Sequence, residues 1–332
     1  MKRTDDVNDL LVSVVIPCHN EAEGIGETLN QLQHVLTRSE YEYELIVVDD
    51  GSPDGTYEKI QELQKNQSRL RGIQLSRNFG KEAALLAGLT AARGDAVITI
   101  DADLQHPPAL IPQMLSYWRQ GFTVVHGVKS DRSGDGVFVR WRAALFNSVF
   151  ARLSGIDVRD SSDFKLLDRL AVDVIVQHLP ERRRFYRGLA DWVGFKQVSI
   201  PFTVAERNNG NGKWSPLALL DLATTALLSF TSAPLRIVNV LGLLTLLFGS
   251  VIAADALWSW SRGKAVSGFT TIIITVLLLG SFIMISLGIV GEYIAKIYEE
   301  IKGRPMYLIA SECGFDDAAD HSNYTRMDCA RR

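Results

Sequence analysis

Two long stretches near the carboxyl-terminal end carry no charged residue, and they constrain the fold more than any other feature. They are residues 237–254 and 267–291. A helix rises about 1.5 Å per residue and a hydrocarbon core is about 30 Å thick, so each stretch can cross a membrane. Both are apolar on every side and contain glycine, which favours membrane helices over buried helices of a soluble core. The sequence predicts transmembrane helices at 235–258 and 267–292.

The short connector between the two stretches carries tryptophans at 258 and 260, which suit a membrane interface. A hairpin of two spans places both chain termini on one side of the membrane. The first residues contain no apolar segment long enough for a signal peptide. The basic residues beside the spans indicate only weakly which side of the membrane the termini occupy. We expect the amino-terminal half and both termini to be cytosolic, with tails at 1–10 and 293–332.

The overall composition excludes several classes of protein. Apolar residues make up 47% of the chain and charged residues 22%, which is not the balance of a disordered protein. The net charge is −3, so bulk charge gives no support for a nucleic-acid partner. The three cysteines are not spaced as CxxC, so a zinc site or a disulfide framework is not expected.

Short β-branched strands alternate with helices in the first 130 residues. Apolar residues at helical spacing predict the first helix, and Ile25, Leu29, Leu32 and Leu36 form its apolar stripe. Strands are predicted at 12–17, 44–50, 72–76, 96–100 and 122–128, and further helices at 56–67, 81–94 and 107–121. This alternation predicts an α/β domain with a mainly parallel sheet.

The alternation of predicted strands and helices is less regular beyond residue 135. The sequence there predicts a basic helix at 138–153, a short strand or turn at 163–169, and one long strand or a strand pair at 195–207. Four arginines fall within residues 181–188. Residues 216–234 have one acidic residue and a wide apolar face, which is typical of a helix that lies in the membrane interface.

Polar turns follow the first four predicted strands: "PCHNE", "DDGSPDGT", "SRNFGK" and "DADLQHPP". Ligands of parallel sheets bind at the carboxyl ends of the strands, so these turns predict one site. Neither the GxGxxG fingerprint nor the P-loop is present. Asp101, Asp103 and Gln105 offer hard oxygens at alternate positions, which Mg²⁺ or Mn²⁺ prefers. An Asx turn before a proline-started helix is the alternative.

These four turns, in this order and spacing, resemble the inverting family 2 glycosyltransferases of GT-A fold. "SSDFKLLDR", "RRRFYRGL", "AERNNGNGKWS" and the two spans further resemble the polyprenyl-phosphate glycosyltransferases, which include dolichyl-phosphate mannose synthases and bacterial undecaprenyl-phosphate glucosyltransferases. The resemblance covers about residues 11–309. It implies a nucleotide-diphospho-sugar transferase domain at 11–215, followed by an interfacial helix and two transmembrane helices in the bacterial inner membrane.

The resemblance also implies roles for individual residues. The nucleotide-sugar donor would be bound by Pro17, Asn20, Glu21, Asp50, Lys81 and Asp101. Asp101, Asp103 and Gln105 would hold a Mg²⁺ or Mn²⁺ ion, with Asp103 and Asp163 as the catalytic residues. Asp163 would lie by the reaction centre, although a helix-start residue is the alternative. Asn211 stands where the family usually has serine, which puts the hydrogen bonding of that loop in doubt.

The acceptor chemistry needs positive charge rather than a strong base. A phosphate monoester has a second pKa of about 6, so a lipid phosphate is already ionised at pH 7. The basic residues expected to hold it are Lys129, Arg140, Arg207 and Lys213. The alternative for such residues is attraction to anionic lipid headgroups.

We therefore expect inverting transfer of one sugar to undecaprenyl phosphate on the cytosolic leaflet, with UDP-glucose as the donor. GDP-mannose, UDP-GlcNAc or a UDP-aminosugar are alternative donors. An alternative of another class is an inactive, membrane-anchored nucleotide-sugar binding protein. A processive polysaccharide synthase is disfavoured, because two spans cannot enclose a polymer path. An oligomer is compatible with the two spans.

Overall fold

The computed structural model describes residues 10–129, 161–179, 181, 184–203, 233–263 and 268–315. Three of the predicted acceptor-site residues, Arg140, Arg207 and Lys213, lie outside these residues. The basic helix predicted at 138–153 does so as well, as does nearly all of the interfacial helix predicted at 216–234. The chain divides into two compact units, residues 1–214 with 305–332 and residues 215–304.

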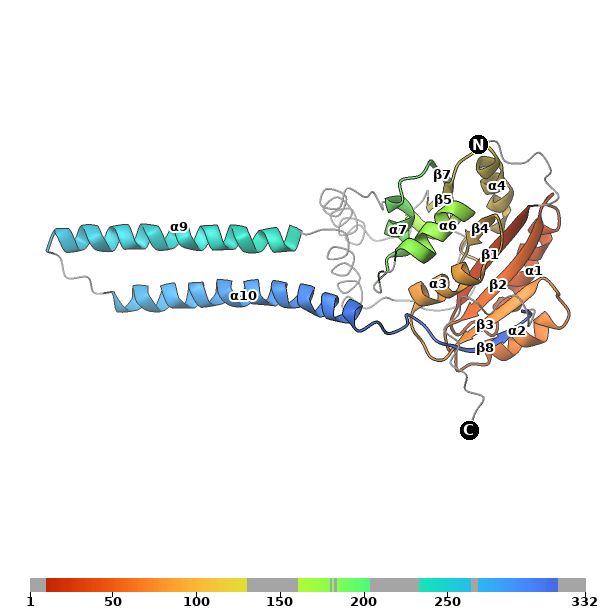
Figure 1. The fold of residues 1–332 in the computed structure, drawn as a ribbon, viewed down its shortest axis with the longest axis horizontal. Helices are drawn as coiled ribbons and strands as arrows, with labels where there is room; N and C mark the ends of the chain where they lie inside the picture. Colours follow the sequence, from red (N-terminus) through yellow and green to blue (C-terminus); the bar gives the residue numbers. More distant parts are fainter. Residues whose placement is uncertain are drawn as a thin grey trace. The chain divides into compact units, whose positions relative to one another are not determined.

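The first unit contains a mixed eight-stranded sheet in the order β7-β5-β6-β4-β1-β2-β3-β8 (Figure 1). Its strands are β1 (Leu11–Cys18), β2 (Glu42–Asp49), β3 (Leu70–Leu75), β4 (Ala96–Thr99), β5 (Val124–Lys129), β6 (Ser161–Asp168), β7 (Gln197–Phe202) and β8 (Ile309–Cys313). The five strands predicted first are confirmed, each within a few residues of its predicted bounds.

The centre of the sheet is parallel, as the alternation of strands and helices predicts. β1 pairs in parallel with β2 and β4, and β2 pairs in parallel with β3. β6 enters between β4 and β5 and is antiparallel to both. The segment predicted at 163–169 as a strand or a turn is therefore a full strand, and it brings Asp163 beside the end of β4.

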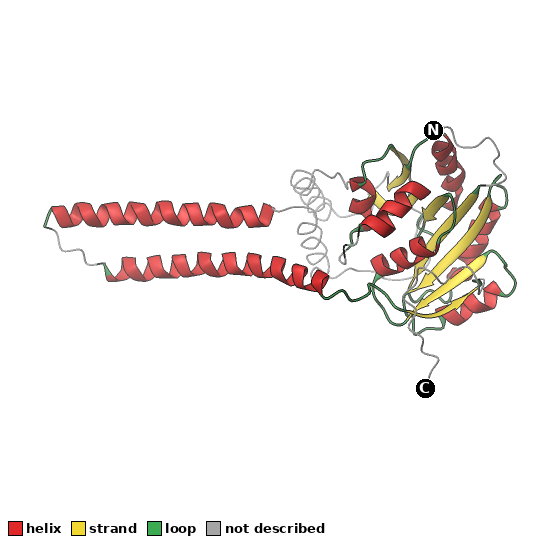
Figure 2. Ribbon diagram, in the orientation of Figure 1, coloured by secondary structure: helices red, strands yellow, loops and turns green. Residues whose placement is uncertain are grey.

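Helices cover both faces of this sheet (Figure 2). The helices that flank the parallel strands are α1 (Ile25–Leu36), α2 (Thr56–Gln64), α3 (Lys81–Ala91) and α4 (Ile111–Arg119). α1, α2 and α4 share a core with the face of β1 that carries Val12, Val14 and Ile16. α3 packs on the opposite face, where a Cβ added at Gly88 would lie 2.3 Å from Val15 Cγ1. Glycine at position 88 thus allows α3 to approach the sheet closely.

Three short elements complete the described part of this unit: α6 (Arg169–Asp173), a π-type turn at Val174–His178 and α7 (Tyr186–Trp192). α6 has an N-cap in which Asp168 accepts a hydrogen bond from the Leu170 N–H at 3.0 Å. The helix predicted at 107–121 is divided, because Pro108–Leu110 forms a 3₁₀ turn before α4 begins.

The second unit contains two long helices, α9 (Ala233–Ser261) and α10 (Phe269–Ile301), which lie side by side. Their apolar segments are Val238–Ser259, with a mean hydropathy of 2.1, and Ile272–Ile301, with a mean hydropathy of 2.7. None of the most apolar part of either segment is buried. Both helices are therefore long and apolar enough to cross a membrane.

Cation–aromatic pairs mark one end of each long helix. The Arg262 guanidinium lies 4.5 Å from the Trp258 ring, and the Lys302 ammonium lies 4.2 Å from the Tyr298 ring. Such amphipathic pairs are typical of residues at a membrane–water interface.

The chain returns to the sheet after α10. β8 pairs antiparallel with β3, and the Leu308 carbonyl accepts a hydrogen bond from the Ser76 N–H at 2.8 Å. The Arg71 guanidinium lies 3.9 Å from the Phe315 ring. The stretch predicted as a tail at 293–332 thus contains the last turns of α10 and a strand of the sheet.

Candidate active site

A pocket lies at the carboxyl ends of the parallel strands. Residues from four chain segments line it: Pro17, Cys18, His19, Glu21, Asp50, Lys81, Ala84, Asp101, Ala102 and Asp103. The polar turns after β1, β2 and β4 and the start of α3 therefore meet in one place. The pocket has a volume of about 170 Å³, which is smaller than the roughly 300–1,000 Å³ of typical ligand pockets.

The turns that form this pocket are fixed by carboxylates at the end of β2. Asp50 accepts hydrogen bonds from the Phe79 N–H at 2.7 Å and the Gly80 N–H at 2.8 Å, which fixes the turn before α3. Asp49 accepts from the Ser52 N–H at 3.2 Å. Burial raises the pKa of Asp50, although these two backbone N–H groups act in the opposite direction. Asp49 and Asp50 thus both act as acceptors for backbone N–H groups of turns.

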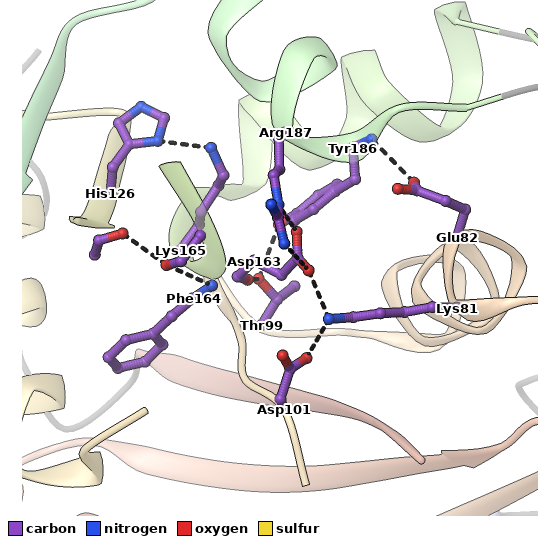
Figure 3. Close-up of polar contacts among 12 residues, drawn as sticks. Lys81, Glu82, Thr99, Asp101, His126, Asp163, Phe164, Lys165, Tyr186 and Arg187 are labelled. Atoms are coloured by element: carbon purple, nitrogen blue, oxygen red, sulfur yellow. Dashed lines mark hydrogen bonds and ion pairs between the residues drawn. The ribbon is translucent and has the colours of Figure 1, made fainter. Parts of the chain in front are cut away.

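Lys81 joins two carboxylates from different strand ends (Figure 3). Its Nζ lies 2.5 Å from Asp101 Oδ1, after β4, and 2.5 Å from Asp163 Oδ2, on β6. Burial lowers the pKa of Lys81, but the two carboxylates outweigh it and raise the pKa above its ordinary value. The ammonium group is thus a permanent positive charge beside the pocket.

Asp163 also receives a second cation, from a residue that the sequence interpretation did not single out. Arg187, on α7, donates from Nε to Asp163 Oδ1 at 2.7 Å and from Nη2 to Oδ2 at 3.0 Å. Burial raises the pKa of Asp163, but Lys81 and Arg187 outweigh burial and hold the pKa well below its ordinary value. Asp163 is therefore ionised at any physiological pH and is unsuited to accept a proton as a general base.

The helix that carries Arg187 is tied to α3 through the half-buried carboxyl group of Glu82. The Tyr186 N–H donates to Glu82 Oε2 at 2.9 Å. Burial and the nearby Asp163 carboxylate raise the pKa of Glu82 to about 7. Glu82 thus titrates near neutral pH, whereas the neighbouring Asp163 does not. The difference arises because two cations contact the Asp163 carboxylate directly.

The turn after β4 supports both interpretations of "DADLQ". The Gln105 N–H donates to Asp103 Oδ1 at 3.1 Å, which is the hydrogen bond of an Asx turn, and Leu104 has a φ of 58°. Asp101 and Asp103 nevertheless both line the pocket.

The donor set in this turn fits a divalent cation. Among the described residues, no group of three or more His, Cys, Asp or Glu side chains is placed to hold a metal ion. Such a group is not required, because Mg²⁺ is commonly held by one or two carboxylates with substrate phosphates. Asp101 and Asp103 supply two hard carboxylates of that kind.

Besides Asp163, the described predicted site residues that do not line the pocket are Asn20, Gln105 and Lys129. Asn20 has a left-handed φ of 59°, and its N–H donates to Ser52 Oγ at 2.9 Å. Neither Asn20 nor Gln105 is among the residues that line the pocket. Lys129 is the last residue of β5, and its backbone pairs with Phe202 of β7.

Comparison with known proteins shows wide similarity along the chain. The family model described as glycosyl transferase family 2 matches residues 13–176. An uncharacterized glycosyltransferase of Synechocystis sp. is 37% identical over 92% of this chain and 96% of that protein. The SfII prophage-derived bactoprenol glucosyl transferase of Shigella flexneri is 36% identical over 90% of this chain and 97% of that protein.

Among solved structures, glucosyl-3-phosphoglycerate synthase from Mycobacterium tuberculosis is 23% identical, with a TM-score of 0.43. The match covers 66% of this chain and 76% of that one.

Proposed function

Because the chain belongs to glycosyl transferase family 2, with a mostly parallel α/β domain of GT-A type followed by two long apolar helices, we propose that it transfers one sugar from a nucleotide sugar to a polyprenyl phosphate. The donor in this proposal is UDP-glucose and the acceptor is undecaprenyl phosphate. The reaction is a single displacement that inverts the anomeric carbon.

The choice of donor and acceptor rests on relatives that align over nearly the whole chain. Proteins named bactoprenol glucosyl transferase from Shigella flexneri and its phages are about 36% identical to it across both the catalytic unit and the two long helices. A long lipid acceptor also explains why a sugar-transfer domain is joined to two membrane-spanning helices. In this proposal the helices cross the bacterial inner membrane and the catalytic unit faces the cytosol.

The observation that carries the catalytic proposal is the convergence of Asp101, Lys81 and Asp163 beside the pocket. Asp101 and Asp103 would hold Mg²⁺ or Mn²⁺, with Gln105 next to them in the turn. A divalent cation supplies Lewis-acid stabilisation of the departing diphosphate. Pro17, Glu21 and Asp50 line the part of the pocket proposed for the nucleoside, with Asn20 at its edge.

The acceptor phosphate requires no protein base, because its oxygen is already ionised at neutral pH. This agrees with the two cations that keep Asp163 ionised. In the proposal Asp163 is an orienting carboxylate at the reaction centre. Lys129, Arg140, Arg207 and Lys213 are proposed to hold the acceptor phosphate, and the membrane keeps the lipid near the site.

A donor panel tests this function. The full-length chain in detergent is incubated with undecaprenyl phosphate, Mn²⁺ or Mg²⁺, and radiolabelled UDP-glucose, GDP-mannose or UDP-GlcNAc. Label in the organic phase is expected with UDP-glucose, to be abolished by EDTA and lowered at least about 100-fold in Asp103→Asn. Label from another donor would replace the donor assignment only. No label from any donor would refute the proposed reaction.

A further inference from the structure

The contact between Arg187 and Asp163 has the geometry of a positioning device. The guanidinium uses two different nitrogens on the two carboxylate oxygens, at 2.7 and 3.0 Å. A paired contact of this kind fixes the plane of a carboxylate, whereas the single Lys81 contact at 2.5 Å fixes only a distance. The Asp163 side chain is only 8% exposed, so water competes little with these contacts.

The backbone of Asp163 is tied to the same helix. Thr99 donates its hydroxyl proton to the Asp163 carbonyl at 2.5 Å. That proton is then committed, so the Tyr186 hydroxyl must be the donor in its 3.0 Å contact with Thr99 Oγ1. Together with the hydrogen bond between the Tyr186 N–H and Glu82, these contacts fix the beginning of α7 against β4 and α3 (Figure 3).

The other end of α7 is held by a buried polar cluster. Lys165 is fully buried, and its Nζ lies 2.8 Å from His126 Nδ1. An ammonium group only donates, so Nδ1 accepts and His126 is neutral with its proton on Nε2. That Nε2 lies 2.9 Å from Gln197 Oε1, on β7, and 3.2 Å from Asp191 Oδ1, on α7. α7 is thus fixed on both sides of Arg187.

We propose that Arg187 is a positioning residue that acts on sugar transfer through Asp163, by holding that carboxylate in one orientation beside Lys81 and Asp101. The proposal rests on the proposed function and deepens it. The competing explanation is that Arg187 binds a phosphate of the donor or acceptor directly, as arginines in transferase sites can. The two explanations differ in whether Arg187 still matters once Asp163 is altered.

A double-mutant cycle on the full-length chain separates these explanations. Transfer from UDP-glucose to undecaprenyl phosphate is measured for the wild type, Arg187→Met, Asp163→Asn and the double variant. We expect Arg187→Met to lower kcat about 100-fold and to change KM for the donor less than about threefold, because orientation rather than binding is lost. The double variant should equal Asp163→Asn within about twofold, since Arg187 has no second route to the reaction.

Two further variants keep the test decisive. Arg187→Lys preserves the charge but not the paired contact, so it should recover only part of the lost kcat. If Asp163→Asn leaves no measurable rate, Asp163→Glu replaces it in the cycle.

Arg184→Met is the matched control, because Arg184 donates to the carbonyls of Ile175 and Leu179 and not to Asp163. The factor by which Arg184→Met lowers kcat should be the same in the wild type and in the Asp163→Asn background. If Arg187→Met also lowers kcat by the same factor in both backgrounds, the positioning role is overturned and the proposed function stays intact. A wild-type chain that transfers no sugar would overturn both.

Discussion

At the scale of single residues, two neighbouring carboxyl groups respond to burial in opposite ways. Asp163 contacts two cations and remains ionised, whereas Glu82 accepts a backbone N–H and has a pKa of about 7. A permanent carboxylate at the site suits an acceptor that arrives already ionised. The chemistry proposed for the lipid phosphate is therefore consistent with the charges that the fold places there.

As pH rises, the ionisation of Glu82 should lower the stability of the fold, whereas the deprotonation of His126 should raise it. Between pH 4.5 and about 7, folded Glu82 holds a proton that the unfolded chain releases, so its ionisation destabilises the fold as pH rises. Glu82→Gln keeps the acceptor oxygen but removes this effect. Relative to wild type, its free energy of unfolding should rise across this window, by up to about 3 kcal/mol at 1.36 kcal/mol per pKa unit.

His126 behaves in the reverse sense. Burial and Lys165 lower its pKa from 6.5 to about 3, so the wild type loses stability as pH falls through this range. His126→Gln should lose less, and its stability relative to wild type should rise toward low pH. Thermal unfolding midpoints of the full-length chain from pH 4.5 to 7 measure both effects. Parallel profiles for the two variants and the wild type would contradict these assignments.

Six of the residues that line the pocket are among those predicted from sequence, but Arg187 is not. Asp101, Asp103 and Lys81 lie in turns directly after strands or at the start of a helix, and parallel pairing brings such turns together. Arg187 lies in a stretch with four arginines, and nothing in that stretch singles it out. Only the packing of α7 against β6 distinguishes it. Lys165 and His126 were not predicted for a similar reason. The sequence of a short strand does not indicate that a titratable side chain is buried.

At the scale of elements, α3 links the core of the sheet to the site. It begins with Lys81 and Glu82, and it contacts β1 and β2 closely at Gly88. A shift of this helix away from the sheet would move Lys81 relative to Asp101 and Asp163. The tight packing at Gly88 is therefore connected to the geometry of the site.

Gly88→Ala should destabilise the chain and lower its activity together. The added methyl group would lie 2.3 Å from Val15 Cγ1 and 3.2 Å from Val48 Cγ2, and overpacking of this kind costs about 1–3 kcal/mol. Gly26→Ala is the matched control, because Gly26 lies in α1 with no atom within 4 Å of an added Cβ. That variant should be neutral or gain up to about 1 kcal/mol from helix propensity. Thermal unfolding would contradict the account if the two variants were equally stable.

The sheet shows where sequence patterns stop being informative. The parallel strands are short β-branched runs that alternate with helices, so both the fold class and the approximate strand bounds follow from local sequence. β8 is only five residues long, and it exists because it pairs with β3 at the edge of the sheet, more than 230 residues earlier in the chain. No local pattern reports a partner at that distance.

At the scale of the whole molecule, the chain leaves the α/β unit, forms two long apolar helices and returns to the same sheet as β8. The hairpin of apolar helices is thus covalently joined at both ends to the unit that carries the site. This arrangement suits an enzyme whose soluble donor and lipid acceptor come from different phases, which is the function proposed here.

The most direct test of the central claim compares two acceptors that differ only in the phosphate group. Full-length protein in liposomes is given radiolabelled UDP-glucose, Mn²⁺ and either undecaprenyl phosphate or undecaprenol. We expect rapid labelling of undecaprenyl phosphate, with a rate that reaches a plateau above about pH 7 as the phosphate ionises, and no labelling of undecaprenol. Equal labelling of both lipids would contradict the central claim, because the enzyme would then have to activate a neutral hydroxyl group.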